Sequence, residues 1–154
     1  RVEVYRAVTL ARAAQTEWGK QSVKARAARI LAFREAVVAR ADEIASLLVK
    51  ENGKTRQEAL VMEIAVVAEV ASYFGKRAPK ILAAQAIPLH LYKTKRSYLH
   101  FVPRGVVGII SPWNFPFSIP IGEMVMALLA RKSPLTRTDS GPCGPSNCHS
   151  LLNR

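Results

Sequence analysis

The residues with the clearest chemical potential form one short run in the last third of the chain, Pro112-Trp113-Asn114-Phe115-Pro116. The Asn114 side-chain amide can donate hydrogen bonds without titrating, and such donors stabilise a carbonyl oxygen that gains negative charge under nucleophilic attack. The prolines exclude a helix and limit the freedom of the loop. Asparagine also closes turns with its own side chain, and spacing alone favours that simpler role for Asn114.

Metal binding is not predicted for this chain. Cys143, Cys148 and His149 lie together near the end, but they supply three candidate ligands at a spacing that is not typical of zinc sites. We interpret both cysteines as exposed thiols in a disordered tail. His90 and His100 each stand alone in a candidate strand, without a second ligand nearby. Two cysteines cannot build a disulfide framework, so the cytoplasm is the expected compartment.

The charge balance raises a second class of function. The 154 residues suit one domain, and 23 Lys and Arg against 11 Asp and Glu give a net charge of +12. Such a charge often marks nucleic-acid binding, yet the basic residues are spread along the chain and are not interleaved with aromatic residues. A basic helical module over residues 20–80 that binds nucleic acid or an anionic surface remains the alternative, and a steep salt dependence of binding would support it. No apolar run approaches the about 18 residues of a membrane span.

The elements that must hold the 112–116 loop begin with helices, because residues 6–75 repeat apolar side chains every three or four positions. The first helix is expected over residues 8–18, with Gly19 at its end. Ser22 is a suitable N-cap for the second helix. The apolar stripe of that second helix consists of Ile30, Phe33, Val37 and Ala41.

Two further helices are expected before residue 76. Asp42 can cap a short helix that ends at Asn52-Gly53. Residues 55–58, Thr-Arg-Gln-Glu, form a capping-box pattern, in which the Thr and Glu side chains each accept a backbone N–H of the other residue. The helix that this pattern opens is expected to reach Phe74-Gly75, and its apolar face should be deeply buried.

The spacing then changes to that of strands. Residues 88–94 and 97–103 alternate as strands do, so Lys93 to Arg96 are expected to turn a hairpin. Residues 106–111 are apolar on both sides of the pleat, which is typical of a buried parallel strand. A helix is expected over residues 120–130. A strand, a tight loop and a helix in this order form the unit on which open α/β sheets bind ligands, beside the carboxyl end of the strand.

The sequence from Gly105 to Pro116, with Ile121-Gly-Glu and Ala127-Leu-Leu-Ala130, resembles the aldehyde dehydrogenase superfamily. Matching segments lie upstream, so the resemblance covers about residues 8–130. They are Arg29-Ile30-Leu31, Glu51-Asn52-Gly53-Lys54, Glu58-Ala59 and Lys95-Arg96. The resemblance implies an α/β fold, of which this chain holds the N-terminal helices, a β-hairpin and the first strand–loop–helix unit of an incomplete cofactor-binding domain.

The same resemblance implies a function and a site. An aldehyde would be oxidised to a carboxylic acid with NAD or NADP, through a thiohemiacetal on a cysteine that lies far downstream in the family. Asn114 would be the oxyanion donor, and four neighbours would line the cofactor cleft. These neighbours are Ile110, Ser111, Pro112 and Trp113. The hairpin near residues 86–102 would belong to an oligomerisation element, so the whole enzyme is expected to be a homo-oligomer.

Residues 131–154 depart from the family pattern. The family continues with Gly-Asn, a strand and Lys-Pro-Ser-Glu, whereas this segment contains no Val or Ile and five Gly or Pro residues. We expect a disordered tail after residue 130, which an out-of-frame reading would produce. The family's general-base Glu has no match, since Glu123 lies on the helix beneath the loop. The isolated chain is therefore expected to be inactive and marginally stable, and a truncated product without a function of its own is a further possibility.

The glycines before the strand are not interpreted as phosphate contacts. Gly105-Val-Val-Gly108 differs from the Gly-x-Gly-x-x-Gly fingerprint of dinucleotide-binding folds. In that fingerprint the glycines follow a strand and open a helix, whereas here they lie at the start of a strand. A bend before the strand is the better interpretation of both residues.

Overall fold

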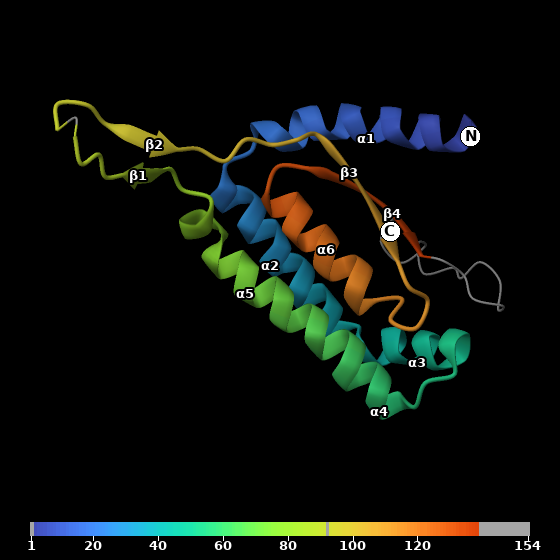
Figure 1. Ribbon diagram of the computed structural model, residues 1–154. Coiled ribbons are helices and arrows are strands. Elements are labelled where there is room, and N and C mark those ends of the chain that lie inside the picture. Colours follow the sequence, from blue (N-terminus) through green and yellow to red (C-terminus); the bar gives the residue numbers. More distant parts are fainter. Residues whose placement is uncertain (1, 92, 139–154) are drawn as a thin grey trace.

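The computed structural model describes residues 2–91 and 93–138, and it shows a helical layer against a small parallel sheet (Figure 1). The helices are α1 (Val2–Lys20), α2 (Val23–Ala39), α3 (Ala41–Asn52), α4 (Arg56–Glu58), the π-helix η1 (Ala59–Ile64), α5 (Ala65–Ile81) and α6 (Ser118–Leu129). The strands are β1 (Gln85–Ile87), β2 (Ser97–Leu99), β3 (Val106–Ser111) and β4 (Ser133–Thr138).

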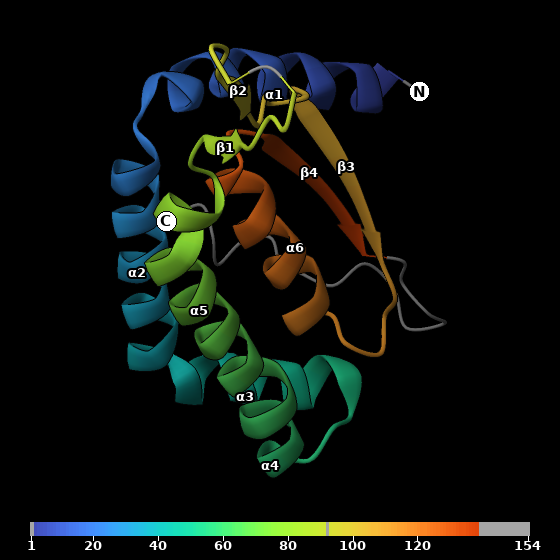
Figure 2. The same ribbon diagram turned by 60° about the vertical axis from the view of Figure 1, so that its left-hand side comes forward.

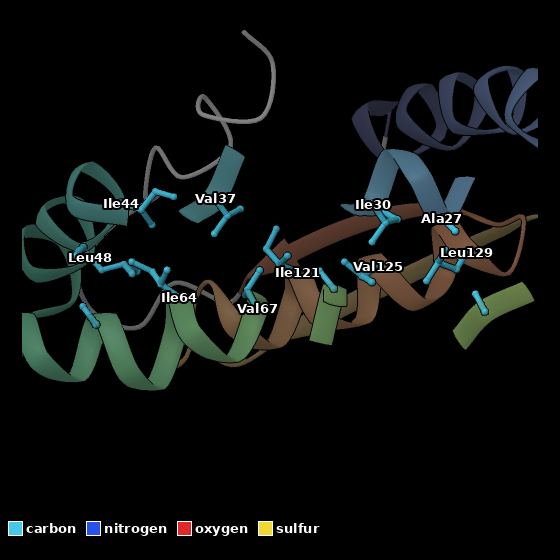
Figure 3. Close-up of a cluster of buried hydrophobic side chains, with 14 residues drawn as sticks. Ala27, Ile30, Val37, Ile44, Leu48, Ile64, Val67, Ile121, Val125 and Leu129 are labelled. Carbon is cyan, nitrogen blue, oxygen red and sulfur yellow. The ribbon is translucent and has the colours of Figure 1, made fainter. Parts of the chain in front are cut away.

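Helix α6 lies at the centre of the fold. One of its sides packs on α2 and α5, and another contacts β3 and β4 (Figure 2). The core is continuous along these helices and reaches α3 and η1 at one end (Figure 3). Each large apolar side chain removed from water in this core contributes about 1.5–3 kcal/mol. The labelled core residues are Ala27, Ile30, Val37, Ile44, Leu48, Ile64, Val67, Ile121, Val125 and Leu129.

Two of the predicted helix starts are confirmed. Ser22 Oγ accepts a hydrogen bond from the Ala25 N–H at 3.1 Å, so it caps α2. Thr55 Oγ1 accepts from the Glu58 N–H at 3.2 Å, while the Glu58 carboxylate accepts from the Thr55 N–H at 2.9 Å. This reciprocal pair is the predicted capping box. The predicted cap of α3 is wrong, because Arg40 occupies that position and Asp42 lies in the first turn.

The helix that the capping box opens is longer than predicted. It continues through Gly75 and Pro79 and ends at Ile81, as part of α5. Gly75 serves interhelical packing here, since a Cβ atom built on it would lie 2.9 Å from Leu31 Cδ2 of α2. Glycine inside this helix therefore leaves room for the Leu31 side chain and does not mark the helix end.

The hairpin is shorter than predicted and begins earlier. Strands β1 and β2 are antiparallel, with Gln85 opposite Leu99 and Ile87 opposite Ser97. The predicted strand over residues 88–94 is wrong, because β1 ends immediately before Pro88. Proline lacks the N–H that a ladder requires, so pairing stops there and the rest of the segment belongs to the connection.

Strand β3 has the predicted bounds, but it has a neighbour that was not expected. Strand β4 runs parallel to it, with Val106 opposite Ser133 and Ser111 opposite Thr138. A strand at residues 133–138 corrects the expectation of a single strand and of a disordered segment from residue 131. Composition could not exclude this pairing, because a parallel ladder is made by backbone groups. The remaining residues of the expected tail lie outside the described residues.

The turn between α6 and β4 has a left-handed residue. Arg131 adopts φ 62°, a region that residues with a Cβ rarely adopt. The Lys132 N–H donates to Ala127 O at 2.9 Å, and the Arg131 N–H donates to Leu128 O at 3.2 Å. These two bonds form a Schellman ending, in which glycine is the usual residue at the left-handed position. The turn directs the chain from α6 back along β3.

Candidate functional site

The 112–117 loop leaves the carboxyl end of β3 and enters α6, as the sequence predicts. Along β3 the side chains alternate, so Ser111 is buried whereas Ile110 is 74% exposed. Pro112, Trp113 and Asn114 are exposed as well. The outer face of β3 is therefore uncovered within the described residues, and the burial that is typical of such an apolar strand is found on one face only.

The five predicted site residues, 110–114, are consecutive: two end β3 and three begin the loop. Ile110 and Trp113 offer exposed apolar surface, and Asn114 is an exposed residue as well. Ser111 faces the same side of β3 as Ile109, and both side chains are buried. The roles of these residues in oxyanion and cofactor binding stay predictions.

One anchor of the loop comes from the end of α3. Asn52 Nδ2 donates a hydrogen bond to Trp113 O at 3.0 Å, across 61 positions of sequence. Helix α3 can end there because Gly53 adopts φ 74°, and its N–H closes the last turn on Val49 O at 3.0 Å. Helix α3 therefore fixes the backbone next to Asn114.

A second anchor is the carboxylate of Glu63 in η1, a side chain with no exposed surface. Its Oε2 accepts hydrogen bonds from the Ser118 N–H at 2.7 Å and from the Phe117 N–H at 3.2 Å. These are backbone donors at the start of α6, whose N-cap residue Phe117 makes no side-chain capping bond. A carboxylate at a helix N-terminus is also favoured by the helix dipole.

Lys54 completes the second anchor. Its ammonium forms an ion pair with Glu63 Oε1 and lies 4.0 Å from the centroid of the Phe115 ring. Only 14% of this lysine side chain is exposed, so water screens the pair and the cation–π contact weakly. Phe115, directly after Asn114, is thereby tied to the same carboxylate that holds Phe117 and Ser118.

Because Glu63 binds the first amides of α6, these amides are not free to bind a phosphate. The first free N–H groups of α6 would make an anion site in the common dinucleotide fold, but here Glu63 occupies them. The finding agrees with the absence of the Gly-x-Gly-x-x-Gly fingerprint. A dinucleotide at this edge would have to place its pyrophosphate away from the start of α6.

Sequence reasoning missed both anchors. Asn52 entered as a predicted helix end and, with Lys54, as part of the resemblance, and Glu63 did not enter at all. One signal was available, since Glu63 is a lone acid among Leu60, Val61, Met62 and Ile64. A charge within an apolar helix face requires a partner, although the sequence does not show which one.

The opposite end of α6 is held by α1 and α2. Arg26 is fully buried, and its Nε and Nη2 donate to Leu129 O at 3.2 and 3.1 Å. Its Nη1 donates to Gln21 O. Trp18 Nε1 donates to Leu128 O at 2.9 Å. Burial, together with the nearby Arg131 guanidinium, lowers the pKa of Arg26 from its usual value. The last carbonyls of α6 are thus satisfied by side chains.

Comparison with known proteins agrees with these features. The profile of the aldehyde dehydrogenase family matches residues 1–137, and the chain belongs to this family. The match includes residues 131–137, which form most of β4 and were expected to lie outside the resemblance. The helical layer, the hairpin and the β3–loop–α6 unit are the part of the family fold that this chain contains.

Individual relatives are semialdehyde and aldehyde dehydrogenases. A putative NADP(+) succinate-semialdehyde dehydrogenase of Mycolicibacterium smegmatis is 35% identical over 138 residues, which are 90% of this chain and 26% of that protein. The succinate-semialdehyde dehydrogenase structure from Burkholderia pseudomallei has a TM-score of 0.80 at 31% identity, covering 89% of this chain and 28% of its own. The structure of an NAD-dependent benzaldehyde dehydrogenase from Corynebacterium glutamicum has a TM-score of 0.75 at 29% identity. The match covers 86% of this chain and 28% of that structure's chain. The chain spans about a quarter of these relatives.

Residues 2–91 and 93–138 lack metal-ligand clusters and membrane-spanning helices. No group of three or more His, Cys, Asp or Glu residues there could hold a metal ion. Cys143, Cys148 and His149 lie outside the described residues. No described helix is long and apolar enough to cross a membrane.

Proposed function

We propose that this chain supplies the oxyanion donor and one wall of the nicotinamide cleft for the NAD(P)-dependent oxidation of an aldehyde to a carboxylic acid. The single observation that carries the proposal is the exposed Asn114 amide at the carboxyl end of β3, on a loop anchored on both sides. A donor held in place before the reaction stabilises developing charge without reorganisation. The names of the relatives support an aldehyde substrate.

The residues at the loop suit a nicotinamide cofactor. Ile110 is 74% exposed and Trp113 is 53% exposed, so they offer a flat apolar surface beside the polar amide of Asn114. When bound, NAD(P) supplies the hydride acceptor of the reaction. The chain's own residues exclude water from one side of the cleft and hold the carbonyl oxygen.

The role of Asn114 can be measured in a graft, in which residues 8–130 replace the matching segment of the M. smegmatis relative. We expect Asn114→Ala to lower kcat by about 100-fold to 1000-fold, the usual cost of removing one oxyanion donor. Reduced-nicotinamide absorbance with succinate semialdehyde measures the rate. Gln57→Ala removes an exposed amide from α4 and should leave kcat unchanged. An active graft whose kcat survives Asn114→Ala would contradict the proposed role.

We propose further that the hairpin arm is an oligomerisation element of the whole enzyme. Its exposed apolar side chains support this, because a surface of this kind is usually covered by another protein surface. They include Ile87, Leu91, Tyr98, Leu99, Phe101 and Val102. A second copy is the expected partner, since closed symmetric pairs are the commonest oligomers.

A further inference from the structure

Glu63 is the most deeply buried acid of the described residues, and the proposed chemistry does not use it directly. Its side chain has no exposed surface, and it makes hydrogen bonds to two backbone amides and an ion pair with Lys54. A buried charge is costly to desolvate, and a hydrophobic residue of similar volume is often as stable. A role beyond stability is therefore worth testing at this position.

The local backbone directs Glu63 towards the loop. Residues 59–64 form a π-helical turn, in which the Ala65 N–H donates to Leu60 O, five positions back. Such turns are rare within α-helices and are frequent at functional sites. This turn lies between α4 and α5, and Glu63 and Ile64 within it are both buried. Glu63 thus contacts the start of α6, while the exposed Met62 faces solvent.

The contacts of Glu63 converge on the residues that flank Asn114. Phe117 and Ser118 lie after Asn114 in the loop and donate directly to the carboxylate. Phe115 is held through its ring by the Lys54 ammonium, which Glu63 itself binds. The other flank is held independently by Asn52 through Trp113 O. Asn114 is therefore the centre of a short span that is fixed at both ends.

We propose that Glu63 is a positioning residue, which sets the place of the Asn114 amide through the ion pair with Lys54 and the first amides of α6. Helix capping alone would require only the bonds to Phe117 and Ser118. The path through Lys54 to the ring of Phe115 adds a contact inside the loop. The catalytic consequence rests on the proposed role of Asn114, whereas the positioning itself does not.

The test is performed on the 154-residue chain by NMR. In Glu63→Gln we expect exchange protection of the Phe117 and Ser118 amides to fall by about tenfold or more, because bonds to a charged acceptor are the strong ones. The backbone order parameter of Asn114 should fall as well. Protection of Val67 and Val125 in the core reports whether the chain remains folded. Glu69→Gln, an exposed acid of α5, is the matched control and should change none of these.

Chemical rescue separates positioning from general damage. In Glu63→Ala a small anion can occupy the space beside Lys54 and the α6 amides, so formate should restore protection of Ser118 and order at Asn114. Chloride at equal ionic strength should not. If Glu63→Ala fails to fold, Lys54→Met tests the same path, with Lys54→Arg as the conservative variant that should retain order at Asn114.

Two results would overturn the proposal. One is an unchanged Asn114 order parameter in Glu63→Gln while Ser118 loses protection, because Glu63 would then cap α6 and nothing more. The other is unchanged protection of both amides. Failure of the proposed function gives a different pair of results. Asn114→Ala would then leave the kcat of the graft unchanged, while Glu63→Gln would still lower the order parameter of Asn114 in the 154-residue chain.

Discussion

At the scale of single residues, charged side chains hold both ends of α6. Glu63 accepts from the first amides of the helix, and Arg26 donates to Leu129 O at its end. Each charge faces the end of the helix dipole that favours it. Neither partner is close in sequence, because 55 positions separate Glu63 from Ser118 and 103 separate Arg26 from Leu129.

Replacement of Arg26 tests how much the second contact contributes. Arg26→Met fills similar volume but leaves the buried carbonyl of Leu129 and the partly buried carbonyl of Gln21 with fewer donors. We expect the free energy of unfolding to fall by about 1–3 kcal/mol, the cost of an unsatisfied buried acceptor. Denaturant midpoints at an unchanged m-value measure this. Lys24→Met, an exposed cation of the same helix, should change the midpoint little, and an equal effect of both variants would refute the argument.

The same residues show the limits of sequence reasoning. The type and place of Asn114 between prolines predicted a loop with chemical potential, and the structure places that loop between β3 and α6. The contacts that fix it could not be predicted, because Asn52, Lys54 and Glu63 lie more than 50 positions away in the sequence. Local pattern predicts an element and its exposed face, whereas a long-range polar partner depends on how the elements pack.

At the scale of elements, two capping signals predicted their helix starts, whereas one glycine was misread as a helix end. Ser22 and Thr55 signal their caps within three residues, and both caps are present. The end at Gly75 was misplaced because glycine has two physical uses, a left-handed terminus or close interhelical contact, and only the neighbour α2 decides between them. The first strand of the hairpin was also misplaced, at residues 88–94 in place of 85–87. Its position depends on which residues of the partner strand it pairs with, and an alternating pattern does not specify them.

The capping box of the α4–η1–α5 segment gives a pH-dependent contribution. Hydrogen bonds from the Thr55 N–H, and then from its hydroxyl, lower the pKa of Glu58. A depressed carboxyl pKa adds stability above the unfolded value of about 4.3, and this stability is lost as pH falls through the folded value. The expected loss therefore lies below about pH 5, on the acid side.

Glu58→Gln isolates this contribution, because glutamine keeps the capping geometry without the charge. We expect the variant to be less stable than the parent at neutral pH, and the difference to shrink on acidification. Unfolding free energies measured at several pH values test this. Glu69→Gln provides the comparison for loss of an exposed carboxylate elsewhere on the segment. A difference that grows towards acid would show that the sign is wrong.

At the scale of the whole molecule, the chain carries the donor side of the proposed reaction and lacks its nucleophile within the described residues, which contain no cysteine. We expect the 154-residue chain to give no reduced nicotinamide from succinate semialdehyde or benzaldehyde with NAD or NADP. A Cys143→Ser, Cys148→Ser variant is the control. Turnover that this variant abolishes would refute the expectation and place a working thiol in the segment after residue 138.

The π-helical turn of η1 has a consequence for chain length. Its backbone ring holds one residue more than an α-helical turn, so the segment behaves as an α-helix with a single insertion. Deleting one position between residues 59 and 64 would restore α-helical winding and keep α4 and α5 in nearly their present register, whereas the side chains of the turn itself would change direction. Helical content would be conserved, yet Glu63 and the capping box could no longer face their present partners together. A relative without that extra position would have to hold its loop with a different side chain.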